Sequence, residues 1–389
     1  MRLTIAADAL VSVRGVIRDS KLVIDSGKLK GVVRRNEEVE DVELELGGSG
    51  RVATPSFVSV HTFLTLYPFR FSVFNGLKNA TELYSVMTSN DAYYFALLAS
   101  YHLARTGVSS VVFSDPYPDT VARAVQEVGL RPYIAVGVGC PESRSDWKNE
   151  FNVLFQRWSA KGRRDVMLKL CTDEELDEVF AVAREAKTLL VVDRTVPLHE
   201  LETKGYIREV PILALGGGTR SDASLIKKYG IHVAFTPSFE VSKFPLSQYD
   251  PAISLDLTPK YDIRHEMSVA VLRLMLKPDE AFKASTVNGC EVLQLDCGTF
   301  ENGAEADVAV FEFREPPSYP FEPASPYESL VFSGCSLETL VVKGEPVVDG
   351  GVPLNVGLAQ VEEATERVQE VDKRAGQKVR NVATNRDLE

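Results

Sequence analysis

Histidine is the side chain most often used to bind catalytic metals and to move protons near neutral pH, and this sequence contains few of them. The 389 residues include five histidines, which are His61, His102, His199, His232 and His265. A metal enzyme with several histidine ligands would need most of this set. Each histidine can therefore be assessed individually as a candidate ligand.

Cysteine is the second residue type that could bind a metal or act as a nucleophile. The sequence has five cysteines, an odd and scattered set without Cys-x-x-Cys spacing: Cys140, Cys171, Cys290, Cys297 and Cys335. This pattern predicts buried thiols rather than a disulfide framework. Cys171 follows an apolar segment, and we expect a buried thiol there rather than a nucleophile, because no histidine is predicted beside it.

Other polar groups lie at the ends of apolar segments. Lys169, in DVMLKLCT, is interpreted as an ion-pairing or anion-binding group. His199 and Glu200 lie shortly after the apolar segment TLLVVD. Adjacent side chains on a helix point about 100° apart, so these two would not bind one ion together. We expect them to be a solvated pair.

Composition restricts the classes of partner. The chain has 43 Lys+Arg and 55 Asp+Glu residues, and its formal net charge is −12. An acidic chain without a dense basic block argues against nucleic-acid and anionic-membrane binding. No apolar run reaches the length of a membrane span, and the start MRLTIAADALVSVRG is too polar and alternating for a signal peptide. Together with the cysteine pattern, these features predict a soluble, cytoplasmic protein.

The elements that must position these side chains follow two patterns. Residues 1–50 and 301–357 alternate apolar and polar residues with Gly-rich turns, which predicts one small β domain built from both termini. Residues 51–300 alternate apolar strands with amphipathic helices, the pattern of a parallel sheet covered by helices. Seven or eight such strands predict an α/β fold of the (β/α)8 barrel type. Residues 358–389 predict a surface helix, frayed beyond Gly376.

Four segments resemble the amidohydrolase superfamily, in particular its cytosine deaminase and chlorohydrolase-like branch. Residues 52–63, VATPSFVSVHTF, resemble the family segment v-x-P-G-f-v-d-x-H-x-H that enters the barrel. Residues 20–35, 285–313 and 341–351 resemble a hairpin of the family's β domain, its closing segment and its final hairpin. The order of these motifs implies a TIM barrel of the metal-dependent hydrolase type plus a composite β-sandwich domain.

The resemblance implies a divalent metal at the C-terminal mouth of the barrel, where it would activate a bound water. The branch takes its ligands from a His-x-His after strand 1, one histidine each after strands 5 and 6, and an aspartate after strand 8. His61 matches the first ligand, and Asp256 stands where the aspartate is expected. Asp193 replaces the strand-5 histidine, and Phe63 replaces the second histidine of the His-x-His motif.

Two more family positions carry side chains without the required chemistry. Val196 stands at the place of the proton-shuttling glutamate, and Ala214 or Leu215 at the place of the strand-6 histidine. The resemblance therefore implies either no cofactor or a single divalent metal, with zinc the first choice, on His61, Asp193 and Asp256. In a retained mechanism His61 and Asp256 would be catalytic, and Asp256 would be the general base.

Three hypotheses about function follow. The first is hydrolysis of non-peptide C–N bonds in cyclic amides or amidines, as the resemblance implies. The second is a metal-free member that binds a small molecule at the barrel mouth or catalyses another reaction, and the third is a non-catalytic partner subunit. A homodimer is the expected assembly, because dimers are common in related folds. The aromatic segment 64–77 would overhang the mouth, where it fills the space vacated by the metal, lines an apolar pocket or packs against a dimer partner.

Overall fold

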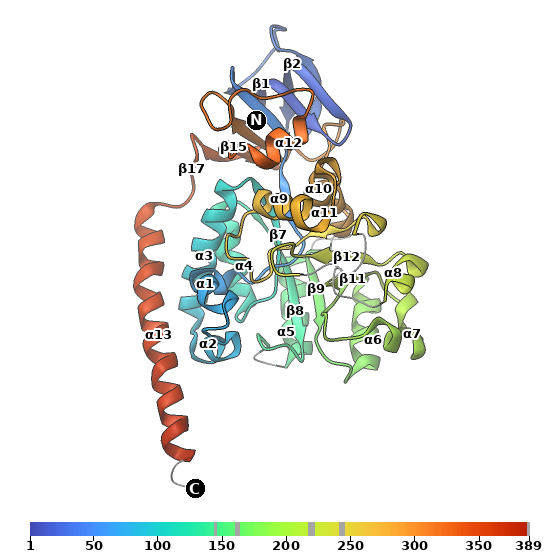
Figure 1. Cartoon of the computed structure of the whole chain (residues 1–389), viewed down its shortest axis with the longest axis vertical. Helices are drawn as coiled ribbons and strands as arrows, with labels where there is room; N and C mark the ends of the chain where they lie inside the picture. The colour runs from blue at the N-terminus through green and yellow to red at the C-terminus, as the bar shows by residue number, and fades with distance from the viewer. Residues whose placement is uncertain (144–145, 160–163, 217–221, 241–245, 387–389) are drawn as a thin grey trace.

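The computed structural model describes residues 1–143, 146–159, 164–216, 222–240 and 246–386, and Figure 1 shows the whole chain. Eight parallel strands form one sheet in chain order: β6 (Phe57–Ser59), β7 (Val108–Phe113), β8 (Arg131–Val138), β9 (Val166–Leu170), β10 (Leu190–Val192), β11 (Ile212–Leu215), β12 (His232–Phe235) and β13 (Ala252–Ile253). All are fully buried except for the first residue of β12 and Pro132, because helices cover them outside and side chains fill the interior.

The sheet is closed by backbone contacts just beyond its first and last strands. The Val60 amide donates to the Ile253 carbonyl at 3.2 Å, and the Leu255 amide donates to the His61 carbonyl at 2.8 Å. Thr62 and Leu255 form a parallel bridge immediately after. The predicted (β/α)8 barrel is therefore confirmed, and its closure places residues 61 and 255 side by side.

Helices follow the barrel strands and cover them. They are α3 (Ser89–Arg105), α4 (Pro118–Val128), α5 (Trp147–Trp158), α6 (Leu176–Ala186), α7 (Leu198–Thr203), α8 (Ala223–Tyr229), α9 (Ile263–Leu274), α10 (Pro278–Ser285) and α11 (Val287–Leu293). In α4 the residues at helical spacing that face the sheet, Val121, Ala122, Val125 and Val128, have no exposed surface. None of the helices in the described ranges is both long and apolar enough for a membrane crossing.

A second sheet combines both ends of the chain. Its nine strands are β1 (Arg2–Ser12), β2 (Gly15–Asp25), β3 (Lys28–Arg34), β4 (Leu44–Gly47), β5 (Arg51–Pro55), β14 (Val308–Glu312), β15 (Ser336–Val342), β16 (Glu345–Asp349) and β17 (Val352–Pro353). The central strand β5 pairs with β1 on one side and with β14 on the other. Figure 1 shows this sheet at one end of the molecule, next to the barrel.

The expected boundary at residue 50 differs from the observed one. Residues 51–55 were expected in the barrel, but they form β5 of the nine-stranded sheet, and the first barrel strand begins at Phe57. The expected sandwich is one continuous sheet that branches at β1, where β4 and β5 share an edge. An apolar run predicts a buried strand without specifying its sheet, so the sequence did not separate β5 from β6.

The C-terminal helix α13 (Leu358–Arg386) lies along the barrel beside α3 and α2 (Ala80–Val86), as Figure 1 shows. It continues past Gly376, where fraying was expected. Ala364 and Val371 are fully buried. Asp91, at 1% exposure, closes the capping box of α3 with Thr88 and also accepts a hydrogen bond from Arg374 of α13 at 2.7 Å.

Replacement of Asp91 with alanine should lower the free energy of unfolding by about 2–3 kcal/mol, because the cap of α3 and the buried anion beside α13 are lost together. Asp372→Ala is the control, since among the described residues Asp372 forms a single, exposed ion pair, with Lys78, and it should change stability by less than about 0.5 kcal/mol. Urea unfolding measures both variants. Equal losses would contradict the role assigned to Asp91.

Candidate functional site

His61 and Asp256 form a buried pair at the C-terminal mouth of the barrel. His61 follows β6 and Asp256 follows β13, so barrel closure brings residues 195 positions apart into contact. The His61 Nδ1 atom lies 2.5 Å from Asp256 Oδ1, and both side chains are at most 1% exposed. The Nε2 atom of His61 is buried and has no hydrogen-bond partner in the described part of the chain. A carboxylate on Nδ1 orients the ring, and Nε2 is then the atom available to a ligand or a metal.

A guanidinium occupies the other side of Asp256. Arg194, two residues after β10, places Nη2 3.5 Å from Asp256 Oδ2 and 3.4 Å from Glu240 Oε1. Burial alone would raise the pKa of Asp256, but His61, Arg194 and Lys169 together hold it below its ordinary value. Asp256 is therefore an ionised carboxylate enclosed by cationic and imidazole groups.

Lys169 lies at the same mouth, on β9. Its Nζ donates to Glu142 Oε1 at 2.7 Å, and both side chains are at most 3% exposed. Ser114 donates to the same carboxylate oxygen at 2.5 Å. The predicted ion-pairing role of Lys169 is thus confirmed. A buried ion pair loses its hydration, which is unfavourable unless the charges are paired and hydrogen-bonded. Glu142 pairs with the Lys169 charge, and Ser114 adds a hydrogen bond to the Glu142 carboxylate.

Phe63, which the resemblance placed at the second histidine of the family motif, lies between Lys169 and His61. Its ring lies 4.5 Å below the Lys169 ammonium and meets the His61 ring edge-on, with 5.1 Å between ring centroids. The lysine therefore has a carboxylate on one side and an aromatic face on another. This geometry gives Phe63 a positioning role between two polar side chains.

The start of the aromatic segment 64–77 is hydrogen-bonded to a buried aspartate. Asp115, which follows β7, accepts hydrogen bonds from the amides of Leu64 and Thr65 and from the Thr65 hydroxyl. Burial raises the pKa of Asp115 to about 7, although these hydrogen bonds act in the opposite direction. Phe69 is buried against Phe95 of α3, with 5.4 Å between ring centroids. This part of the segment therefore packs in the core against α3, which is none of the three roles expected from the sequence.

The remaining sequence candidates do not join the His61–Asp256 pair. Asp193 accepts hydrogen bonds from the amide and hydroxyl of Thr195 through Oδ1, in the turn that follows β10. His199 has 64% of its side chain exposed and lies 3.9 Å from Asp222. Within the described ranges, one group of three His, Cys, Asp or Glu residues has its ligand atoms within 4.8 Å of one another, and it contains neither His61 nor Asp193.

That compact group is Cys140, Glu142 and Cys171, and it corrects the expectation of free thiols. Cys140 and Cys171 form a disulfide, and Cys290 and Cys297 form a second one. The sequence separation of 31 residues concealed the first disulfide, because only the pairing of β8 with β9 brings their ends together. Only Cys335 remains a buried free thiol, as expected.

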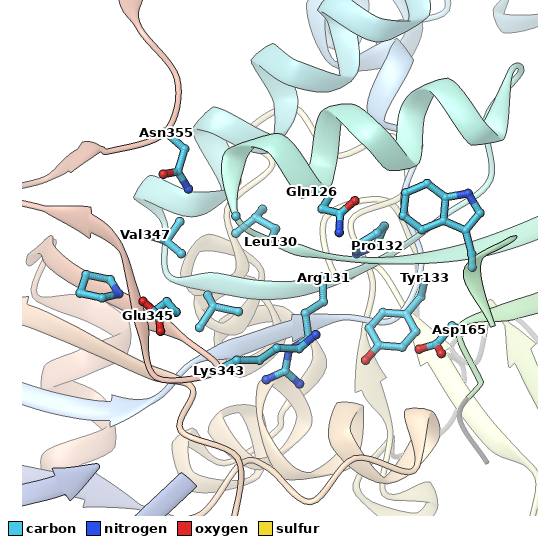
Figure 2. A pocket seen from close by; sticks show the side chains of 14 residues that line it. Gln126, Leu130, Arg131, Pro132, Tyr133, Asp165, Lys343, Glu345, Val347 and Asn355 are labelled. Carbon is cyan, nitrogen blue, oxygen red and sulfur yellow. The ribbon is translucent and has the colours of Figure 1, made fainter. Parts of the chain in front are cut away.

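A cavity of about 480 Å³ lies at the opposite, N-terminal end of β8. Figure 2 shows Arg131 and Lys343 reaching into it, with Tyr133 beside Asp165. Arg131 is 4% exposed and forms ion pairs with Glu305 and Asp307 of the segment leading into β14. These pairs join the barrel to the nine-stranded sheet, so we assign Arg131 a structural role.

Comparison with known proteins agrees with this architecture. The model of the amidohydrolase family matches residues 256–347. An adenosine deaminase from Xanthomonas campestris with bound zinc superposes with a TM-score of 0.84 at 15% identity, over 95% of this chain and 98% of that one. A triazine hydrolase from Arthobacter aurescens gives a TM-score of 0.80 at 14% identity, over 96% and 99%.

The chain resembles the amidohydrolase superfamily, whose family model matches residues 256–347. Its similar relatives include a 5-methylthioadenosine/S-adenosylhomocysteine deaminase from Pyrococcus abyssi, 25% identical over 85% of this chain and 91% of the relative. A 5'-deoxyadenosine deaminase from Methanosarcina mazei is 25% identical over 85% and 88%. The superfamily resemblance predicted from residues 52–63 and the later motifs is thus confirmed.

Sequence reasoning missed Arg194, Glu142 and Glu240 in this superfamily site. Arg194 lies next to the Asp193 that was considered, and Glu142 lies two residues beyond Cys140. The signal that could have identified them is a charged residue within a few positions of a barrel strand's carboxyl end. The pairing of Lys169 with Glu142 required the fold.

The raised pKa of Asp115 predicts a pH-dependent contribution to stability. Between its ordinary pKa of 3.8 and the folded value of about 7, the folded state retains a proton that the unfolded state has released. This contribution is fully present below about pH 4 and is lost as the pH rises towards 7, with a slope of at most about 1.4 kcal/mol per pH unit. Asp115→Asn should make the slope of unfolding free energy against pH less negative. Asp349→Asn, the same change at an exposed position, should keep the original slope.

The Lys169–Glu142 pair predicts strong coupling between two substitutions. Glu142→Gln leaves a buried ammonium without its carboxylate and should lower the free energy of unfolding by about 3 kcal/mol. Adding Lys169→Met removes the stranded charge and should restore most of the loss. Denaturant unfolding of both single variants and the double variant measures the coupling. A double variant whose loss equals the sum of the two single losses would show that the two side chains act independently.

Proposed function

We propose that this chain binds a small molecule at the C-terminal mouth of its amidohydrolase barrel and does not use a resident zinc ion. The ligand class is a ring with amide or amidine C–N bonds, as the names of the adenosine-type deaminases similar to this chain suggest. One observation carries the proposal. The cationic groups of Arg194 and Lys169 lie beside the buried imidazole–carboxylate pair of His61 and Asp256.

The donor set at the mouth does not fit a catalytic zinc ion. His61 Nε2 is a buried atom that could ligate a metal. Both carboxylate oxygens of Asp256 are already engaged, because Oδ1 contacts the Nδ1 atom of His61 and Oδ2 faces Arg194. Phe63 carries no donor atom, and catalytic zinc usually has three protein ligands. A dication would also face repulsion from Arg194 and Lys169 in a poorly screened site.

These same groups suit recognition of a polar ring. The Nε2 atom of His61 and the guanidinium of Arg194 offer hydrogen bonds to ring nitrogens and carbonyl oxygens. Phe63 supplies an apolar face beside them. A few convergent polar groups with an apolar wall are typical of small-molecule sites.

The expected homodimer remains a prediction.

Retained metal-dependent hydrolysis is the second candidate, and the unpartnered Nε2 atom of His61 favours it. In that case His61, Asp256 and Asp193 would be the ligands, and the metal would lower the pKa of a bound water. The two candidates differ in metal content. They also differ in the sensitivity of any activity to a chelator.

Protein produced with zinc in the medium and then dialysed should contain far less than one equivalent of metal and should not deaminate 5'-deoxyadenosine or 5-methylthioadenosine. A panel of nucleosides and cyclic amides should include compounds that raise the melting temperature. A free ligand concentration of 100 times Kd raises the free energy of unfolding by about 2.7 kcal/mol. His61→Ala should abolish this shift, while His199→Ala, an exposed histidine just past β10, should retain it.

One equivalent of zinc together with chelator-sensitive hydrolysis would overturn the proposal in favour of the second candidate. The absence of a shift with every compound of the panel would contradict binding at the mouth. An equal loss in His61→Ala and His199→Ala would also contradict it, because only His61 belongs to the proposed site.

A further inference from the structure

A second charged cavity lies where the nine-stranded sheet meets helices α3 and α9. Its volume is about 600 Å³, and it shares no lining residue with the barrel mouth. Four arginines and two glutamates contribute the charges of its lining: Arg51, Arg105, Arg264, Arg314, Glu312 and Glu338. Two positive charges are therefore in excess.

The cavity-lining arginines in and next to the nine-stranded sheet, Arg51 and Arg314, have carboxylate partners, but not every donor of Arg51 has an acceptor. Arg51 Nη2 donates to Glu338 Oε1 at 2.6 Å, and Nη1 donates to the Ser49 carbonyl at 3.2 Å and lies 3.8 Å from Glu312. Arg314 also pairs with Glu312, at 2.5 Å. Although the Arg51 side chain is only 9% exposed, its Nε atom has no acceptor among the described residues. A buried donor without an acceptor is unfavourable, and a bound ligand can supply one.

The two cavity-lining arginines that lie on barrel helices have no carboxylate partner in the described ranges. Arg105, the last residue of α3, is exposed, and its Nε donates to the Gly351 carbonyl at 3.1 Å. Arg264, near the start of α9, donates to the Cys335 carbonyl and stacks over Phe311 at 4.9 Å. Its Nε atom is buried and also lacks an acceptor among these residues. Two uncompensated guanidinium groups thus face the cavity from the barrel side.

We propose that this cavity binds a sugar phosphate, with the phosphoryl group held by Arg51, Arg105 and Arg264. Guanidinium groups match the geometry of phosphate oxygens and bind them through paired hydrogen bonds. The cavity lies within the size range of small-molecule sites, so it has space for an organic body as well as the phosphoryl group.

Glu338 distinguishes a sugar phosphate from a bare anion. Its Oε1 atom is held by Arg51, and its buried Oε2 atom has no donor among the described residues. A carboxylate oxygen next to the arginines would repel a free anion, whereas it accepts a hydrogen bond from a hydroxyl group. A sugar phosphate supplies both the phosphoryl oxygens and the hydroxyls.

Calorimetric titration of the whole chain with ribose 5-phosphate, inorganic phosphate and ribose tests the proposal. Ribose 5-phosphate should bind most tightly, inorganic phosphate more weakly and ribose undetectably. Binding should weaken as salt is added, because the contacts are charged and partly exposed. The absence of binding by either phosphate compound at up to about 10 mM would overturn the proposal. Equal affinity for the two would overturn the assignment to a sugar phosphate.

Three variants separate the cavity from the overall charge of the protein. Arg105→Gln should weaken binding about tenfold, the loss expected when a charged hydrogen bond is removed. Arg273→Gln removes the same charge from the exposed surface of α9, outside the cavity, and should leave binding unchanged. Glu312→Gln removes a competing carboxylate and should tighten binding, a gain that general damage to the fold would not produce. Equal weakening in Arg105→Gln and Arg273→Gln, or weaker binding in Glu312→Gln, would contradict the proposal.

Discussion

The closure of the barrel between β6 and β13 is the contact on which the site depends. The hydrogen bond from the Leu255 amide to the His61 carbonyl joins residues that are far apart in the chain. It also fixes the next residue, so the Asp256 carboxylate reaches the Nδ1 atom of the His61 ring. Because the strands are parallel, the groups that follow the other strands gather at the same mouth. The polar cluster is thus a consequence of sheet closure.

Charge compensation by side chains of the chain itself is the second organising feature of this mouth. Relatives of known structure include zinc-bound proteins with the same barrel. Here the buried carboxylates Asp256 and Glu142 have cationic partners from the chain itself, namely Arg194 and Lys169. Buried charges are costly unless they are paired and hydrogen-bonded, and these pairs meet that requirement. This is the physical basis of the proposed metal-independent site.

The junction between the barrel and the nine-stranded sheet uses arginine in two ways. At the N-terminal end of β8, Arg131 is buried against Glu305 and Asp307, and its charge is compensated within the protein. At the other charged cavity, Arg105 and Arg264 have no carboxylate partner in the described ranges. The first arrangement holds two parts of the chain together. The second leaves binding capacity for an anion.

Periodicity and local motifs in the sequence determined the architecture. Apolar strands alternating with amphipathic helices predicted the barrel, and the segments that became β6, β9, β10, β11 and β13 were identified as its strands. The segment VATPSFVSVHTF placed His61 at the mouth and carried part of the resemblance to the superfamily. Such features are local, because each depends on residues within one strand or helix. The position of β5 escaped this reasoning, since its burial is the same in either sheet.

Only the tertiary structure decided which polar groups meet. His61 and Asp256 were each singled out from the sequence, but Asp193 bonds to Thr195 in its own turn and does not complete a compact group with them. The pairs of Lys169 with Glu142 and of Cys140 with Cys171 each span about thirty residues and depend on neighbouring strand ends. The sequence determines which groups are available and which strands carry them. Their distances and partners depend on the closure and register of the barrel, which long-range packing sets and no local pattern encodes.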